Sequence, residues 1–175
     1  MSKKVNYNNS TLKDVIIIKP ETFYDHRGEY VEIFNNETYN LNNLNLNFVQ
    51  DDISISSKNV LRGIHGDNKT WKLISCLYGS FYFVVVNNNP KSEQYKKWQS
   101  FLLSDKNRLQ ILVPPNFGNG HLVISDTAIF HYKQTSYYDP STQFTIKWND
   151  PEFSIWWPTK DPILSRRDDL GHFVD

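Results

Sequence analysis

The chain is organised around one segment, Val60-Leu61-Arg62-Gly63-Ile64-His65-Gly66-Asp67-Asn68-Lys69-Thr70-Trp71-Lys72. An apolar pair leads into a cation, a glycine, a histidine and a Gly-Asp step, and a Trp-Lys pair closes the segment. This order predicts a strand, a turn and the start of a second strand. A potential general base, two cations that can hold or polarise an anionic group, and an aromatic side chain stand within this short unit, which is a composition typical of a catalytic site.

The runs on either side of this segment have the length and the composition of strands. They are rich in β-branched and aromatic residues, and asparagine clusters separate them, because asparagine tolerates turn conformations. We expect strands at residues 15–18, 30–34, 48–55, 73–77, 81–86, 98–103, 109–113, 121–124, 129–134 and 145–148. Strands of this length and spacing predict an all-β sandwich or barrel.

Helical structure is expected only in short pieces. Residues 36–42 and 165–170 are the two candidates, and Ser165 is a suitable N-cap for the second. Residues 114–120 combine prolines, glycines and asparagines, so we expect an irregular loop there, at a barrel mouth. The whole chain of residues 1–175 is interpreted as one domain, with an N-terminal arm (1–14) that packs on a neighbouring subunit, a β-barrel (15–160) and a C-terminal segment (161–175) that contributes to the site.

Charge and cysteine content narrow the classes of partner and of location. The formal net charge is zero, which argues against nucleic acid and membrane surfaces, since both attract clustered cations. Cys76 is the one cysteine, so we expect no internal disulfide and interpret it as a small buried strand residue. The N-terminal residues carry charge and are not followed by an apolar run, so we expect a cytoplasmic protein that acts on a small molecule.

His65 is the first candidate for chemistry. Arg62 and Lys72 flank it, and the glycines beside it permit close approach of the backbone. A histidine that acts as a base needs an acceptor on its other ring nitrogen, and either Asp168 or Asp169 could supply one.

Two further residues, Tyr132 and Arg27, have a structural and a functional interpretation. Strand alternation puts Tyr132 on the opposite face from His131 and Lys133, so Tyr132 could face a barrel interior as a packed or as a catalytic residue. Arg27 lies in a charged turn and would suit a diphosphate, although a solvated hairpin turn has the same composition.

A metal site is not expected. Small β-barrels that bind divalent ions often use a His-x-His pair together with a carboxylate and a later histidine. No such pair occurs among the histidines of this chain, which are His26, His65, His121, His131 and His172.

Taken in order, these motifs resemble those of the nucleotide-sugar 3,5-epimerase family, whose best known members act on dTDP-4-dehydro-6-deoxyglucose on the way to rhamnose. The resemblance runs through Phe23-Tyr24-Asp25-His26-Arg27-Gly28, Phe48-Val49-Gln50-Asp51, Val60 to His65, Lys72-Leu73, Tyr132-Lys133, Tyr137-Tyr138, Trp148-Asn149-Asp150-Pro151, Trp157-Pro158 and Leu164-Ser165-Arg166-Arg167-Asp168. It implies a cupin-like jelly-roll barrel, a homodimer, a nucleotide-diphosphate sugar as substrate, and no metal or redox cofactor.

The resemblance also implies roles for individual residues. His65 would remove the proton α to a 4-keto group with Asp168 as its partner, Lys72 would stabilise the enolate, and Tyr132 would return a proton from the opposite face. The substrate would be held by Arg27, Arg62, Gln50, Asn119, Phe23 and Glu32.

The chain departs from the rhamnose enzymes at two places. His65-Gly66-Asp67 and a short loop replace a His-Tyr-Gln-like triplet and a longer loop before the lysine. Asn116-Phe117-Gly118-Asn119-Gly120-His121 replaces Gly-Phe-Ala-His-Gly-Phe, so Asn119 occupies the place of a second pocket histidine. Both departures resemble epimerases of GDP-4-keto-6-deoxy-heptose in capsule biosynthesis, which is therefore the expected substrate class, with C3, C5 or both inverted. The alternatives are a nucleotide-sugar 3,4-ketoisomerase and a non-catalytic sugar-binding cupin.

Overall fold

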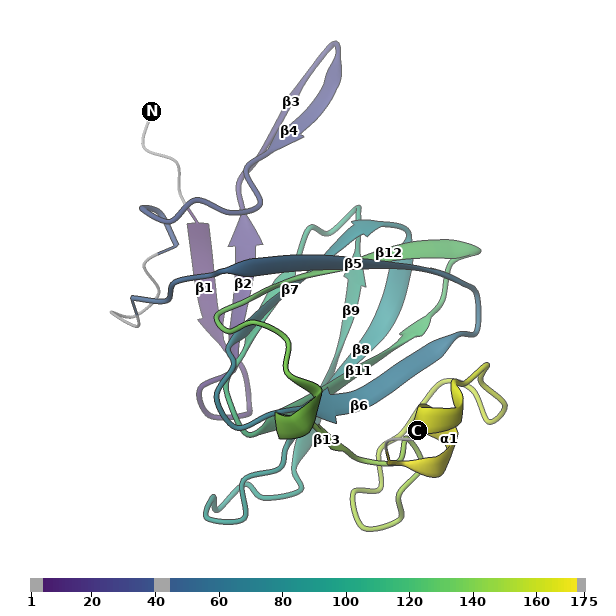
Figure 1. The fold of residues 1–175 in the computed structure, drawn as a ribbon. Coiled ribbons are helices and arrows are strands. Elements are labelled where there is room, and N and C mark those ends of the chain that lie inside the picture. Colours follow the sequence, from purple (N-terminus) through teal and green to yellow (C-terminus); the bar gives the residue numbers. More distant parts are fainter. Residues whose placement is uncertain (1–4, 40–44, 173–175) are drawn as a thin grey trace.

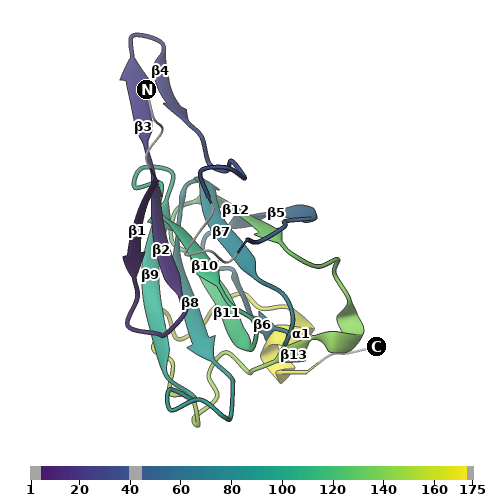
Figure 2. The ribbon, with the colours of Figure 1, turned by 90° about the vertical axis from the view of Figure 1, so that its left-hand side faces the viewer.

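The computed structural model describes residues 5–39 and 45–172, which form two facing antiparallel sheets (Figures 1 and 2). The six-stranded sheet has the order β1 (Val5–Asn9), β2 (Ile16–Pro20), β10 (Gln110–Val113), β7 (Lys72–Tyr78), β12 (Thr127–Gln134) and β5 (Gln50–Ser57). The five-stranded sheet has the order β13 (Phe144–Thr145), β6 (Leu61–Gly66), β11 (Phe117–Val123), β8 (Ser80–Asn87) and β9 (Trp98–Ser104). This double-sheet arrangement is a jelly roll, so the expected all-β class is confirmed, with two separate sheets in place of a closed barrel.

Three smaller elements complete the fold. A hairpin of β3 (Thr22–Asp25) and β4 (Gly28–Val31) projects away from the two sheets (Figure 1). A 3₁₀ turn, η2 (Pro140–Thr142), precedes β13, and one short helix, α1 (Arg166–Leu170), lies beside β6 near the C-terminus. Ser165 caps α1 by accepting a hydrogen bond from the Asp168 amide, as its position in the sequence predicts.

Successive side chains of a strand point to opposite faces of its sheet, so the core lies in layers, and β8 contributes to two of them. Phe81, Phe83 and Val85 point between the two sheets, where fully burying each phenylalanine contributes roughly 1.5–3 kcal/mol. Val84 and Val86 point to the other face of the five-stranded sheet, where Phe153 and Trp157 from the connection between β13 and α1 belong to the same cluster. The cluster also contains Leu61 and Ile64 of β6, so it fixes this connection against the strand that carries His65.

Several expected elements differ from the observed ones. The strand expected at residues 30–34 ends at Val31, and of residues 145–148 only Thr145 lies in a strand, because β13 is Phe144–Thr145. Residues 36–39 form a turn in place of a helix, and 40–42 lie outside the described residues. The N-terminal arm contributes β1, which pairs with β2 of its own chain.

The loop expected at residues 114–120 is shorter than predicted: residues 114–116 form a turn, but β11 already begins at Phe117. Gly118 and Gly120 suggest a loop by composition but belong to a strand that lies unusually close to β6. A Cβ atom on Gly118 would come within 2.5 Å of the Ile64 side chain, and one on Gly120 within 2.9 Å of the Arg62 carbonyl oxygen.

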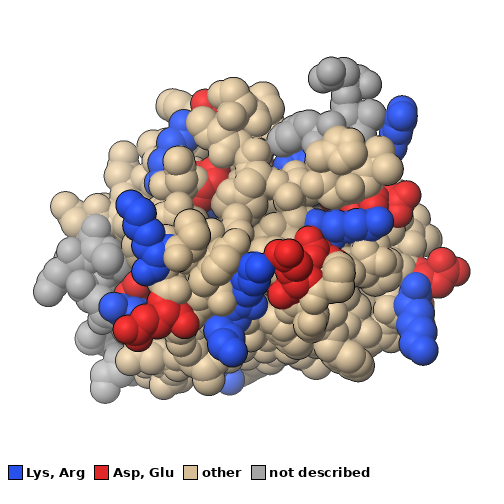
Figure 3. Space-filling view, turned by 90° about the horizontal axis from the view of Figure 1, so that it is seen from below, with Lys and Arg blue, Asp and Glu red and all other residues tan. Residues whose placement is uncertain are grey.

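Cys76 agrees with its interpretation from the sequence as a small buried strand residue. Cys76 is buried in the core, and burial raises the pKa of its thiol to about 12. Acidic and basic side chains are interspersed over the face seen in Figure 3. No helix within residues 5–39 and 45–172 is long and apolar enough to cross a membrane.

Candidate active site

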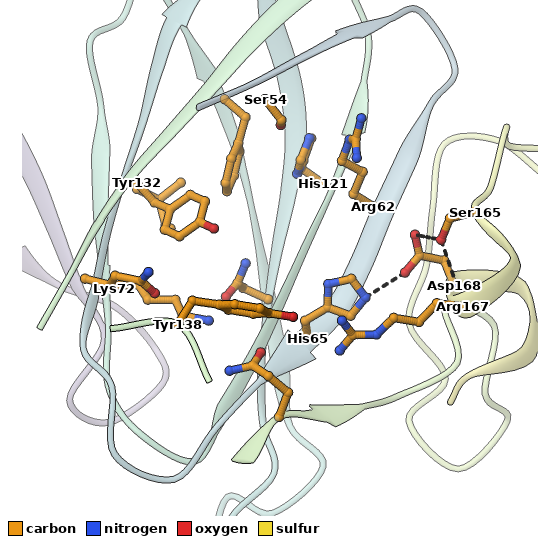
Figure 4. A pocket seen from close by; sticks show the side chains of 15 residues that line it. Ser54, Arg62, His65, Lys72, His121, Tyr132, Tyr138, Ser165, Arg167 and Asp168 are labelled. Atoms are coloured by element: carbon orange, nitrogen blue, oxygen red, sulfur yellow. Dashed lines mark hydrogen bonds and ion pairs between the residues drawn. The ribbon is translucent and has the colours of Figure 1, made fainter. Parts of the chain in front are cut away.

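A cavity of about 260 Å³ opens between the two sheets beside α1 (Figure 4). Its walls come from β5, β6, β7, β11 and β12 and from the segments around η2 and α1. The lining residues are Ser54, Arg62, His65, Lys72, Ile74, Asn119, His121, Phe130, Tyr132, Gln134, Tyr138, Gln143, Ser165, Arg167 and Asp168.

An irregularity in the β6–β11 pairing brings Arg62 and His65 to the same cavity. Residues three apart in a regular strand point to opposite faces. Here Asn119 pairs with His65 while His121 pairs with Arg62, so β6 carries one extra residue between the two pairs. This bulge turns both side chains inward, and Gly63 within it has a backbone φ of 115°.

His65 and Asp168 form the most tightly defined contact of the cavity. The distance from His65 Nε2 to Asp168 Oδ1 is 2.7 Å, and Asp168 is 2% exposed. Asp168 also accepts hydrogen bonds from the Ser165 hydroxyl (2.7 Å) and the Gly63 amide (3.3 Å). Burial opposes its ionisation, but the bonds to His65, Ser165 and Gly63 outweigh burial and lower its pKa. The carboxylate is therefore suited to hold the histidine and to stabilise a proton on it.

Tyr132 and Lys72 lie across the cavity from His65 and Asp168 (Figure 4). Phe130 and Tyr132 line the cavity, whereas the amino group of Lys133 lies over the Phe34 ring outside it, so the expected alternation along β12 is confirmed. Burial, together with the neighbouring Asp52 carboxylate, raises the pKa of Tyr132 to about 12. The Tyr132 hydroxyl therefore keeps its proton at neutral pH.

Lys72 begins β7 and its side chain is 12% exposed. Burial lowers the pKa of its amino group, the Asp67 carboxylate opposes that change, and Arg167 adds to it. A cation in such a poorly hydrated position interacts strongly with negative charge on a bound molecule.

Asn119 and His121 lie on the same face of β11 and both line the cavity. The Asn119 Oδ1 and His121 Nε2 atoms are buried and have no hydrogen-bond partner among the described residues. The His121 ring stacks on Phe130 with 4.2 Å between centroids. Burial first, and the nearby Arg62 charge second, lower the pKa of His121 to about 3, so this histidine is neutral.

Four residues expected to bind substrate do not line this cavity. Gln50 lies behind it, where its side-chain oxygen accepts a hydrogen bond from the Tyr138 amide (2.9 Å). Phe23 and Arg27 belong to the projecting hairpin, where Arg27 pairs with Asp25 at 2.6 Å and its side chain is 78% exposed. Glu32 follows the hairpin directly and is also outside the cavity lining.

The cavity also contains residues that the sequence did not single out as site residues. Tyr138 and Gln143 come from the segment after β12, and Arg167 comes from α1, where its Nε donates to the Thr145 hydroxyl at 2.9 Å. Tyr138 and Arg167 stand in motifs quoted for the family resemblance, so their motif membership was the available signal. No group of three or more histidine, cysteine or acidic residues with metal-binding geometry occurs within the described part of the chain.

Comparison with known proteins connects this geometry to one family. The family model described as dTDP-4-dehydrorhamnose 3,5-epimerase matches residues 9–174. The dTDP-4-dehydrorhamnose 3,5-epimerase of Escherichia coli is 41% identical over 176 residues, which cover 98% of this chain and 95% of that protein.

Two solved structures extend the similarity to the fold. The crystal structure of dTDP-4-dehydrorhamnose 3,5-epimerase from Elizabethkingia anophelis has a TM-score of 0.89 and 38% identity, and the match covers 96% of this chain and 95% of that one. The dTDP-6-deoxy-D-glucose-3,5-epimerase of Legionella pneumophila, solved with dTDP-4-keto-L-rhamnose, has a TM-score of 0.91 and 35% identity over 96% of this chain and 92% of that one. The chain therefore belongs to the dTDP-4-dehydrorhamnose 3,5-epimerase family and is an isomerase.

Proposed function

We propose that the protein epimerises a dTDP-4-keto-6-deoxy sugar at C3, C5 or both, by removing and returning the proton α to the ketone with its own side chains. The observation that carries this proposal is the placement of the His65–Asp168 pair across one cavity from Tyr132, with Lys72 beside the tyrosine. Inversion at one carbon needs a base on one face and an acid on the other.

In the first half of the reaction, His65 takes the α proton. The C–H bond breaks, its electron pair moves toward the ketone, and the 4-keto oxygen becomes an enolate oxygen. Asp168 stabilises the imidazolium that forms, because its carboxylate is 2.7 Å from the ring nitrogen. The Lys72 ammonium stabilises the negative oxygen in a site where few waters compete.

In the second half, Tyr132 donates its proton to the opposite face of the same carbon. The carbonyl re-forms as the new C–H bond is made, and the tyrosine is left as a phenolate. A pKa of about 12 keeps the proton on Tyr132 until a strongly basic carbanion is present. Arg62 and Arg167, both at the cavity wall, are suited to the diphosphate, and Asn119 to a sugar hydroxyl.

The hairpin and the outer sheet face support a homodimer in which each hairpin serves the partner's cavity. Phe23 and Arg27 belong to the hairpin that projects from the two sheets, they do not line their own cavity, and the Arg27 side chain is highly exposed. Ile53 and Ile55 on the outer face of the edge strand β5 are 59% and 61% exposed, an apolar surface that a second copy would cover. In such a dimer Phe23, Arg27 and Glu32 would bind substrate, as their motif predicts.

The choice of dTDP follows the names of the relatives described above. The expectation of a GDP-linked heptose in capsule biosynthesis finds no support among them. We also propose a cytoplasmic location, because Cys76 is a buried free thiol that needs no oxidising compartment.

Solvent exchange tests the reaction directly. Incubation with dTDP-4-dehydro-6-deoxyglucose in deuterated water with EDTA should place deuterium at C3, C5 or both, as read by NMR. The GDP-4-keto-6-deoxy-heptose serves as the comparison substrate. If no 4-keto nucleotide sugar gains deuterium, the proposal is wrong. A 3-keto product would indicate the ketoisomerase, and binding without exchange would indicate a sugar-binding protein.

Two variants separate the base from the acid. His65→Asn should reduce exchange at both carbons by about 10²–10⁴-fold, because the base is lost. Tyr132→Phe should impair inversion by a similar factor while exchange at the face of His65 continues. Tyr137→Phe is the matched control, since Tyr137 is 73% exposed, and it should behave as wild type. Full activity in either site variant would overturn the role assigned to that residue.

A further inference from the structure

Asp67 is a buried acid that stands next to the cavity without lining it. It is 3% exposed and directly follows β6. Its Oδ1 atom accepts hydrogen bonds from the amides of Lys69 (2.9 Å) and Thr70 (2.7 Å), which fixes the turn into β7. An asparagine or a serine could hold that turn equally well, so the turn does not explain why the residue carries a charge.

The second carboxylate oxygen faces the catalytic lysine. Asp67 Oδ2 is 3.9 Å from Lys72 Nζ and accepts a hydrogen bond from Gln143 Nε2 at 3.1 Å. The Asp67 side chain is 2% exposed and that of Lys72 is 12% exposed, so water screens the pair weakly. The distance is longer than a tight ion pair, which leaves the ammonium protons available to a bound oxygen.

Several other groups surround the Lys72 amine. Arg167 approaches from α1 with the same charge as Lys72, and Tyr132 from β12 and Tyr138 from the following segment line the same cavity. His65 from β6 is held by Asp168, whose charge is directed to that ring. Burial and Arg167 both favour the neutral amine, whereas Asp67 favours the ammonium.

We propose that Asp67 is a positioning residue that acts through Lys72: its carboxylate is the counter-ion that keeps the buried lysine charged where the enolate oxygen develops. The consequence for the reaction rests on the proposed function, but the counter-ion role can be measured without substrate.

Charge removal at constant shape tests this role. Asp67→Asn keeps the Oδ1 acceptor for the turn and removes the charge. The pH dependence of Lys72 acetylation by acetic anhydride, read by mass spectrometry on the folded protein, reports how much of the amine is unprotonated. The midpoint should fall by about 1–3 pH units in the variant, as for an opposite charge removed from within 4–6 Å. If the protein epimerises, the loss of kcat at high pH should also occur at lower pH in the variant than in the wild type, by the same shift.

The controls distinguish charge from shape. Asp139→Asn removes an exposed carboxylate that caps the nearby 3₁₀ turn through the Ser141 amide, and it should leave the Lys72 midpoint unchanged. Asp67→Ser repeats the charge removal with a hydroxyl cap should the asparagine variant not fold. Asp67→Asn combined with Gln143→Glu moves the charge to the other end of the same hydrogen bond and should restore the midpoint.

The outcomes separate this role from the proposed reaction. A lowered midpoint in a protein that exchanges no solvent supports the counter-ion and rejects the epimerase mechanism. An unchanged midpoint in Asp67→Asn or Asp67→Ser overturns the counter-ion even if epimerisation is normal. A lowered midpoint that the double variant fails to restore, with the fold intact, assigns the effect to shape and also overturns it.

Discussion

At the scale of the residue, His121 shows how burial controls charge. The folded protein holds it with a pKa of about 3, whereas an unfolded histidine titrates near 6.5. Between these values the unfolded chain binds the additional proton. The contribution of a neutral His121 to stability is therefore fully present above about pH 6.5 and is lost as the pH falls toward about 3.

We predict that His121→Phe flattens the pH dependence of stability. The ring would keep its stacking on Phe130, but the slope of the unfolding free energy between about pH 4 and 6 should decrease by about 1.4 kcal/mol per pH unit. Urea unfolding at several pH values measures this slope. His172→Phe changes an exposed histidine and should retain the wild-type slope. Parallel curves for His121→Phe and wild type would show that His121 titrates normally.

The hydrogen-bond acceptor of His65 shows how far the sequence alone can identify a site residue. Asp168 and Asp169 are adjacent, and the need for an acceptor alone does not choose between them. The start of α1 makes the choice. The Ser165 hydroxyl donates a hydrogen bond to the Asp168 carboxylate, and the Asp168 amide donates one to the Ser165 hydroxyl. A Ser-x-x-Asp spacing at a helix N-terminus is a sequence signal for this arrangement. Capping therefore orients Asp168 back toward β6, and Asp169 lacks that spacing.

At the scale of the element, β6 depends on a glycine that the composition alone suggested only as flexible backbone. Gly63 has a φ of 115°, and a Cβ atom there would lie 2.6 Å from Gly120 Cα and 2.7 Å from the Asn119 carbonyl oxygen. Both obstacles are backbone atoms of β11 and cannot rotate away. The bulge that turns Arg62 and His65 inward therefore requires glycine at this position.

We predict that Gly63→Ala destabilises the protein by about 2–4 kcal/mol, the combined cost of the backbone conformation and of the backbone clash. Gly28→Ala is the matched control, because Gly28 also has a positive φ, 124°, but no atom lies within 4 Å of its added Cβ. Its cost should be about 1 kcal/mol. Chemical denaturation measures the free energy of unfolding of both variants, and equal losses of stability would contradict the close approach of β6 and β11.

The elements that the sequence did predict are runs rich in β-branched and aromatic residues, such as β8 and β12. Those it missed are determined by distant contacts. The start of β11 contains glycines because β6 packs against it, and β1 is asparagine-rich but finds its partner in β2. Local composition cannot report either contact. In the same way, the lining of the cavity by Tyr138 and Arg167 depends on where two long connections place them.

At the scale of the whole molecule, the position of the hairpin bears on the proposed dimer, in which each site would be shared by two chains. The hairpin that carries Arg27 projects from the two sheets, and Arg27 does not line the cavity that holds His65, so in the proposed dimer each complete site combines the hairpin of one chain with the cavity of the other. A chain with Arg27→Ala would keep an intact cavity, and a chain with His65→Asn would keep an intact hairpin.

Co-expression of these two variants should therefore restore activity that neither has alone. If subunits mix at random, half of the dimers are mixed and each contains one complete site, so about a quarter of the wild-type kcat should return. Co-expressing His65→Asn with Tyr132→Phe should restore nothing, because both residues belong to the cavity of one chain. Restoration in the second mixture, or its absence in the first despite a dimer by sedimentation, would mean that the hairpin does not serve the partner's site.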